Sequence, residues 1–150
     1  MTVTTASGYE LNTLTYNGTN VPFVNGEYKF FMPASDVTVT ATFSQSTYNI
    51  TYELNGGSVA TANPETYTVE TETFTLNNPT KTGYNFAGWT GTGLNGPTMN
   101  VTIAQGSIGD RSYTATWNII TYNLTYDLAG GIVATANPET YTVETETFTL

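Results

Sequence analysis

The sequence has 150 residues, of which 12 are acidic and three are basic, so its formal net charge is −9; it contains no Cys and no His. Three scattered cations on an acidic chain do not suit a nucleic-acid backbone, which requires clustered Lys and Arg, and no nucleic-acid partner is expected. Without Cys or His there is no disulfide framework, no thiolate or imidazole metal site and no nucleophilic triad.

The residue usage favours strands over helices. Thr supplies 33 residues and Tyr 11, whereas the helix formers Lys, Arg, Gln and Met are scarce. No apolar run approaches the ~18 residues that a membrane helix needs, so membrane insertion is not expected. These features predict a mainly β fold with little helix.

The first 44 residues carry two turn signals and one alternating strand. Asn25-Gly26 separates two apolar segments and predicts a two-residue hairpin of type I′, because both turn positions need positive φ. Asn17-Gly18 predicts a second, similar turn. From Val37 to Phe43 apolar side chains alternate with Thr, which indicates a strand with one face in the core.

Residues 48–76 predict a strand, a loop and a hairpin. The alternation from Tyr48 to Leu54 indicates a strand that ends at Asn55-Gly56-Gly57, and Asn63-Pro64 makes the following segment a loop. Beyond it the apolar parity changes from odd positions (Tyr67, Val69) to even positions (Phe74, Leu76). A strand cannot change parity without a turn or bulge, so we expect a turn at 70–73 and a second hairpin around it.

The segment 79–117 carries the aromatic residues expected at the centre of the core. These are Tyr84, Phe86 and Trp89, and burying each is worth on the order of 4 to 6 kcal/mol by the area that aromatic rings cover. Met99, Val101 and Ile103 indicate a further strand, 105–107 a turn with one helical turn before it, and 113–117 the closing strand.

Residues 122–150 repeat residues 48–76 at an offset of 74, with 25 of 29 positions identical. The closing strand 113–117 corresponds to 39–43 at the same offset, and Gly83-Tyr84 corresponds to Gly8-Tyr9 at an offset of 75. A unit of about 74 residues is long enough to bury a small core of its own. We therefore predict three parts: the C-terminal part of a repeat at 1–44, a complete repeat at 46–117, and the N-terminal part of a further repeat at 119–150.

The complete unit resembles the Listeria-Bacteroides repeat, the family of the internalin B B-repeat. The similar motifs are the first strand followed by Asn55-Gly56-Gly57, the central PTKTGYNFAGW at 79–89, and the closing YTATW at 113–117. Residues 1–44, with GYELNTLT and FMPASDVTVTATF, resemble the C-terminal part of the divergent form of this repeat. The resemblance implies tandem, small, β-grasp-like domains with antiparallel or mixed sheets, on a secreted or cell-surface bacterial protein. It brings no catalytic motif and no cofactor, and we expect no enzyme.

Acidic and aromatic side chains supply the remaining candidate sites. Glu70 and Glu72, repeated as Glu144 and Glu146, can attract Ca2+ if they share a strand face, although a solvated turn explains them more simply, and no metal site is predicted. Tyr16, Tyr28 and Tyr122 are candidates for stacking on sugar rings or contacting a host protein. Core or cross-strand packing is the simpler interpretation of each.

The two incomplete repeats lead to the main functional hypothesis. Each leaves apolar strand faces and edges without partners, so the N-terminal part of a repeat at 119–150 is expected to complete the part at 1–44 of another copy, head to tail. Neighbouring parts supplied within a longer array, and pairing of the two parts within one chain, remain alternatives. The predicted function is that of a structural, adhesin-type repeat acting as a stalk or filament unit, with a binding module for a host protein or glycan as the alternative.

Overall fold

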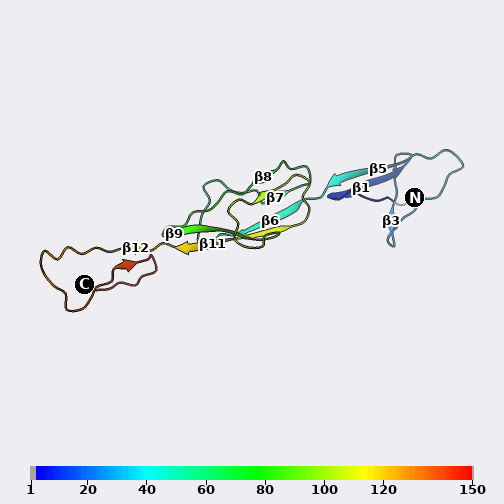
Figure 1. Ribbon diagram of the computed structural model, residues 1–150. Coiled ribbons are helices and arrows are strands. Elements are labelled where there is room, and N and C mark those ends of the chain that lie inside the picture. Colours follow the sequence, from blue (N-terminus) through cyan, green and yellow to red (C-terminus); the bar gives the residue numbers. More distant parts are fainter. Residues whose placement is uncertain (1–2, 150) are drawn as a thin grey trace. The chain divides into compact units, whose positions relative to one another are not determined.

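The computed structural model describes residues 3–149 (Figure 1). Within this range the chain forms strands, turns and loops and no helix, so the mainly β fold class is confirmed and the expected helical turn before 105–107 is absent. None of the described segments is a helix that could cross a bilayer. The strands are β1 Tyr9–Tyr16, β2 Thr19–Asn20, β3 Phe23–Val24, β4 Glu27–Tyr28, β5 Val39–Gln45, β6 Tyr48–Glu53, β7 Thr66–Tyr67, β8 Phe74–Thr75, β9 Tyr84–Gly91, β10 Thr102–Ile103, β11 Arg111–Ile119, β12 Tyr122–Asn123 and β13 Thr140–Tyr141.

The described residues form two compact units. The first comprises the chain up to Asn49 together with Thr66–Thr73 and Ile103–Asp110. The second comprises Ile50–Glu65, Phe74–Thr102 and the chain from Arg111 onwards. This division does not follow the predicted repeat boundaries at 1–44, 46–117 and 119–150, which stay a prediction.

The first unit is built on an antiparallel pair of β1 and β5 (Figure 1). β2 pairs with the other side of β1. Both Asn-Gly turns form as predicted: Asn25 and Gly26 have φ of 52° and 82° between β3 and β4, and Asn17 and Gly18 have φ of 43° and 79° between β1 and β2. The strand expected to begin at Val37 begins at Val39, and Phe43, which was expected on the core face, is exposed.

The first unit also contains β7, which pairs with the first two residues of β6 through Tyr48↔Tyr67 and Asn49↔Thr66. After β7 the chain turns at Thr68–Thr71, where the amide of Thr71 donates to the carbonyl of Thr68 over 3.1 Å. The segment Ile103–Asp110 lies against this turn, since the amide of Gly106 donates to the Val69 carbonyl at 2.9 Å and the Tyr67 hydroxyl donates to the Gly109 carbonyl at 2.5 Å.

The second unit combines a parallel and an antiparallel strand pair. The rest of β6 pairs parallel with β11 over Ile50–Glu53, and β11 pairs antiparallel with β9. The first and last long strands of the repeat are thus parallel neighbours, which is consistent with a β-grasp-like arrangement. The strand ends before Asn55-Gly56-Gly57 as predicted, and Asn55 and Gly56 turn the chain with φ of 49° and 81°.

The predicted second hairpin around 70–73 is wrong. The parity change is real, but the turn lies earlier, at Thr68–Thr71, and β8 pairs with β10 instead of β7. The Leu76 amide donates to the Val101 carbonyl at 2.9 Å, and the hydroxyls of Thr75 and Thr102 lie 3.0 Å apart. A strand pairs with whichever edge satisfies its backbone groups, and here that edge is remote in sequence.

Trp89 lies in the core as predicted, but the two neighbouring aromatic residues predicted there are not fully buried. Trp89 is fully buried and its indole Nε1 donates to Asn78 Oδ1 at 3.0 Å. Tyr84 and Phe86 are only half-buried, with Phe86 packing edge-on against the rings of Trp89 and Trp117, each at 5.5 Å. Met99, expected in a strand, is exposed outside β10. The remaining buried apolar residues are Leu14, Val21, Ile50, Tyr67, Val69, Leu76, Val101, Ile103, Tyr113 and Ala115.

Candidate functional site

The packing of Tyr52 shows how the first strand of a repeat closes its core. In the second unit the Tyr52 ring lies 6.0 Å from the Trp89 ring and 6.4 Å from the Tyr113 ring, and its hydroxyl donates to the Pro64 carbonyl at 2.8 Å. Burial raises the pKa of Tyr52 to about 12, and Tyr113 and Glu65 act in the same direction. Tyr52 therefore stays neutral, and its ring covers the apolar face of β9 and β11.

The N-terminal part, residues 1–44, contains the same strand pair without a tyrosine that covers it. β1 and β5 correspond to β9 and β11, and both pairs have a bulge at the same place, because the register skips Asn12 in β1 and Ala87 in β9. β5 is the last strand of its sheet, whereas β11 has β6 on its other side. A cavity of about 930 Å3 opens at this face, and the residues that line it include Leu11, Leu14, Val21, Val37 and Val39.

The C-terminal copy repeats the start of the complete unit but not its strand. Tyr122↔Tyr141 and Asn123↔Thr140 pair as Tyr48↔Tyr67 and Asn49↔Thr66 do. The following residues 124–127 correspond to the paired segment Ile50–Glu53, yet they form no strand.

The C-terminal copy is also less buried than the start of the complete unit, although the two sequences are identical at the positions compared. Tyr141 is 39% exposed where Tyr67 is 3% exposed, and Val143 is 46% exposed where Val69 is 9% exposed. No counterpart of Ile103–Asp110 packs against the described part of this copy, so its apolar side chains lie open.

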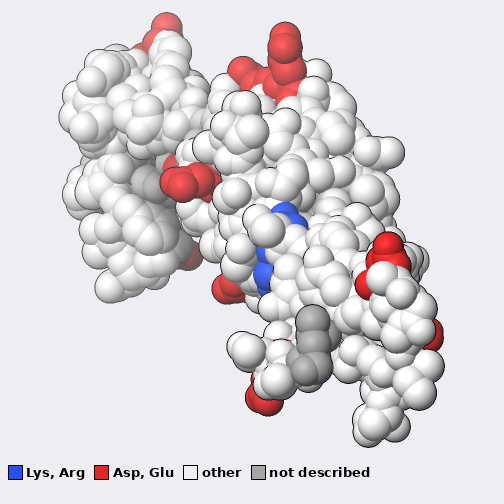
Figure 2. Space-filling view, turned by 90° about the vertical axis from the view of Figure 1, so that its left-hand side faces the viewer, with Lys and Arg blue, Asp and Glu red and all other residues white. Residues whose placement is uncertain are grey.

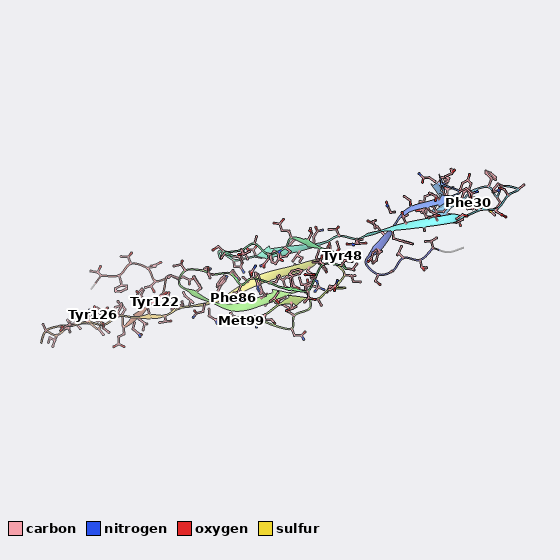
Figure 3. All side chains as sticks on the ribbon, turned by 90° about the horizontal axis from the view of Figure 1, so that it is seen from above. Phe30, Tyr48, Phe86, Met99, Tyr122 and Tyr126 are labelled. Carbon is pink, nitrogen blue, oxygen red and sulfur yellow. The ribbon has the colours of Figure 1, made fainter. Side chains whose placement is uncertain are left out.

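Two of the three predicted tyrosines lie together. Tyr16 stacks on Phe30 with ring centroids 4.5 Å apart and planes 9° from parallel, and Tyr28 packs on Phe23 at 4.7 Å. Tyr16 and Tyr28 both line a cavity of about 650 Å3, together with Phe30 (labelled in Figure 3), which sequence reasoning did not single out although it lies in the apolar run 30–32. Tyr122 is in the second unit, where its ring packs across the strand pair on Tyr141 at 5.3 Å.

Two of the four acidic candidates, Glu70 and Glu144, accept hydrogen bonds from tyrosines. Tyr9 donates its hydroxyl proton to Glu70 at 2.6 Å, and Tyr84 donates to Glu144. In the described range 3–149 no three acidic side chains gather into a group that could hold a metal ion. On the face shown in Figure 2 the acidic side chains are dispersed over the surface instead of converging in one patch.

The shared strand pair, bulge and turns define a class of small, all-β repeat module. Residues 48–115 match the Listeria-Bacteroides repeat domain, and residues 1–47 match the divergent InlB B-repeat domain. The family resemblance is thereby confirmed: the first of these stretches is a Listeria-Bacteroides repeat and the second is its divergent form. Such repeats occur in bacterial surface or extracellular proteins and are typically non-enzymatic structural modules. Comparisons with curated proteins and with solved structures found no match.

Proposed function

We propose that the chain is a structural spacer of a bacterial surface or extracellular protein, in which incomplete repeats are completed head to tail by the complementary part of another copy. The observation that carries this proposal is the parallel pair between Ile50–Glu53 and Arg111–Thr114. In both incomplete repeats the counterparts of this pair, 124–127 at one end and 37–40 at the other, have no parallel strand beside them.

The strand bounds support this interpretation. β11 begins at Arg111, whereas β5 begins two residues later than the corresponding position, at Val39. β6 runs for six residues, whereas its copy β12 ends after two. Each shortfall lies where the parallel partner is missing, because an extended segment without ladder hydrogen bonds is not held as a strand. Adding the parallel strand from another copy supplies those bonds.

The side chains are complementary as well. Tyr126 (labelled in Figure 3) corresponds to Tyr52. Its hydroxyl already donates to the Pro138 carbonyl at 2.7 Å, as that of Tyr52 does to the Pro64 carbonyl. Leu14 and Val39 stand where the complete repeat has Trp89 and Tyr113, and they line the cavity of about 930 Å3. The ring of Tyr126 has the shape and polarity to enter that cavity from a second copy.

Sedimentation velocity over a dilution series at physiological salt tests the proposal. The wild-type chain is expected to associate with rising concentration, and Leu124→Asp is expected to abolish association, since Leu124 corresponds to the buried Ile50. The matched control is Ile132→Asp, because Ile132 is 96% exposed and corresponds to the exposed Ser58, and it should associate like wild type. A wild-type chain that stays monomeric at every concentration contradicts head-to-tail completion.

A second function, recognition of a glycan or host protein through aromatic side chains, is favoured by the cavity that Tyr16 and Tyr28 line. Under this alternative, binding to a glycan array is lost in Tyr28→Ala and retained in Tyr122→Ala, because Tyr122 packs on Tyr141 in the other unit. A spacer binds no glycan, so we expect no binding by wild type or by either variant. Binding that depends on Tyr28 would favour the second function.

A further inference from the structure

The same four-residue contact occurs twice, at positions that the repeat makes equivalent. Gly8 and Tyr9 meet Val69 and Glu70 in the first unit, 61 residues apart along the chain between Tyr9 and Glu70. Gly83 and Tyr84 meet Val143 and Glu144 in the second unit, with a separation of 60. In both cases the Gly-Tyr step belongs to one repeat and the Val-Glu step belongs to the repeat that follows it.

The glycines make room for the valines. A Cβ on Gly8 would lie 1.9 Å from Val69 Cγ1, and a Cβ on Gly83 would lie 2.1 Å from Val143 Cγ1. Both glycines have left-handed backbone, with φ of 82° and 77°, which residues with a side chain adopt at a cost. The contact therefore depends on Gly at these positions for two separate reasons.

Backbone hydrogen bonds preorganise the Gly-Tyr side of each contact. The Tyr9 amide donates to the Ala6 carbonyl and the Tyr84 amide to the Lys81 carbonyl, both at 3.1 Å. The Gly8 carbonyl accepts from Ser46 at 2.8 Å and the Gly83 carbonyl accepts from Ile120 at 2.9 Å.

The Val-Glu side is preorganised by threonines. Val69 and Glu70 occupy the tip of the turn Thr68–Thr71, whose ends are joined by a bond from the Thr68 amide to Thr71 Oγ1 at 2.9 Å. Thr142 and Thr145 make the same bond at 2.8 Å in the copy. The copy keeps this turn although much of it is exposed, so the turn is a local property of its sequence.

We infer that this contact is the joint between consecutive repeats: the Thr-Val-Glu-Thr turn of each repeat docks on the Gly-Tyr step of the repeat before it. The partner of the surface is thus the next repeat of the same array. The apolar contact of Val with Gly fixes how closely the two repeats approach each other. The hydrogen bond from Tyr to Glu fixes the rotation of one repeat about that contact. The inference rests on the spacer function for its meaning, because a joint that resists bending is what a spacer needs.

The electrostatics of the tyrosines follow from the joint. The hydrogen bond to Glu70 raises the pKa of Tyr9 above 10.0, and the hydrogen bond to Glu144 raises the pKa of Tyr84 above 10.0, with burial as the second cause in both cases. Lys81 lies over the Tyr84 ring, with Nζ 4.0 Å from its centroid. A raised pKa means that the joint favours the protonated phenol. The Tyr–Glu bond is therefore complete below pH 10 and is lost as pH rises through the raised pKa.

Because the chain contains two joints, one can be altered while the other serves as the control. In Glu144→Gln we expect the pKa of Tyr84 to fall toward 10.0 while that of Tyr9 stays raised, as followed by the 13Cζ NMR shifts of the tyrosine rings during a pH titration. Glu146→Gln, two residues along the same exposed segment, should change neither pKa. If the pKa of Tyr84 is unchanged in Glu144→Gln, the inference of a joint is overturned.

Stiffness is measured in the same molecule by 15N relaxation, at a concentration below that of any association. Amides of 122–149 and of β9 and β11 are expected to share one rotational correlation time in wild type. Val143→Asp, which places a carboxylate against Gly83, is expected to shorten the correlation time of 122–149 alone, and Ile132→Asp is expected to change nothing. Independent tumbling already present in wild type overturns the inference. Head-to-tail association is tested by Leu124→Asp. The spacer proposal and the inferred joint can therefore be contradicted independently.

Discussion

Replacing Trp89 with Ala is expected to destabilise the complete repeat by about 3–5 kcal/mol, the range found when a buried large aromatic is truncated. Trp89 is fully buried, and its ring lies 6.0 Å from that of Tyr52 and 5.5 Å from that of Phe86. The substitution also leaves Asn78 Oδ1 without the indole donor that it accepts from at 3.0 Å. Stability of single domains is about 5–15 kcal/mol in total, so this loss takes a large part of it.

Urea unfolding followed by fluorescence measures this effect, because Trp117 remains as a reporter in the variant. The control is Phe31→Ala, a deletion of another large aromatic at a site that is 97% exposed, and it is expected to change the free energy of unfolding by no more than about 0.5 kcal/mol. A loss below about 1 kcal/mol for Trp89→Ala would show that the core of the repeat is not centred on this side chain.

Replacing Gly91 with Ala is expected to open the pairing of β9 with β11. The new Cβ would lie 2.0 Å from the Ser112 carbonyl oxygen and 3.1 Å from the Tyr113 Cα, both backbone atoms that cannot move without shifting β11. Gly91 also has a φ of 139°, which a residue with a side chain rarely adopts. Backbone strain of roughly 1–3 kcal/mol and overpacking of a similar size act together, so we expect a loss of about 2–5 kcal/mol.

Gly96→Ala is the matched control for this prediction. Apart from Gly96 itself and its two chain neighbours, no residue has an atom within 4 Å of the position of its Cβ, and its φ is not in the left-handed range. Because Ala restricts the unfolded chain more than Gly does, this change should be neutral or stabilising by up to about 1 kcal/mol. The midpoints of urea unfolding of the two variants are compared with wild type, and equal midpoints for Gly91→Ala and Gly96→Ala would contradict the steric account.

Local features of the fold could be predicted because they depend on neighbours in sequence. The turn at Asn25-Gly26 follows from the tolerance of both residues for positive φ, and β6 follows from the alternation that begins at Tyr48. The family resemblance was also available, since it rests on short motifs around Gly56 and Trp89. The bulges at Asn12 and Ala87 were not predicted, because neither residue carries a signal that differs from its neighbours.

The candidate site was predicted in part. Tyr16 and Tyr28 were singled out as exposed aromatics, and the structure brings both to one cavity, whereas Phe30 was missed. Glu70 was interpreted as part of a solvated turn or a Ca2+ site, and its bond to Tyr9 could not be anticipated because the partner lies 61 residues away. The use of Tyr16, Tyr28 and Tyr122 as ligand contacts stays a prediction.

The amino-acid sequence by itself determined the repeat, the strand-rich composition and the turns. Tertiary structure alone decided how strands far apart in the sequence pair and which faces are covered. The identical segments 59–76 and 133–150 demonstrate the difference, because Tyr67 is buried where Tyr141 is 39% exposed. Their local conformational preferences are the same, and both copies keep the turn that begins at Thr68 or Thr142. Burial and strand pairing require partners from elsewhere in the chain, and only the first copy has those partners packed against it.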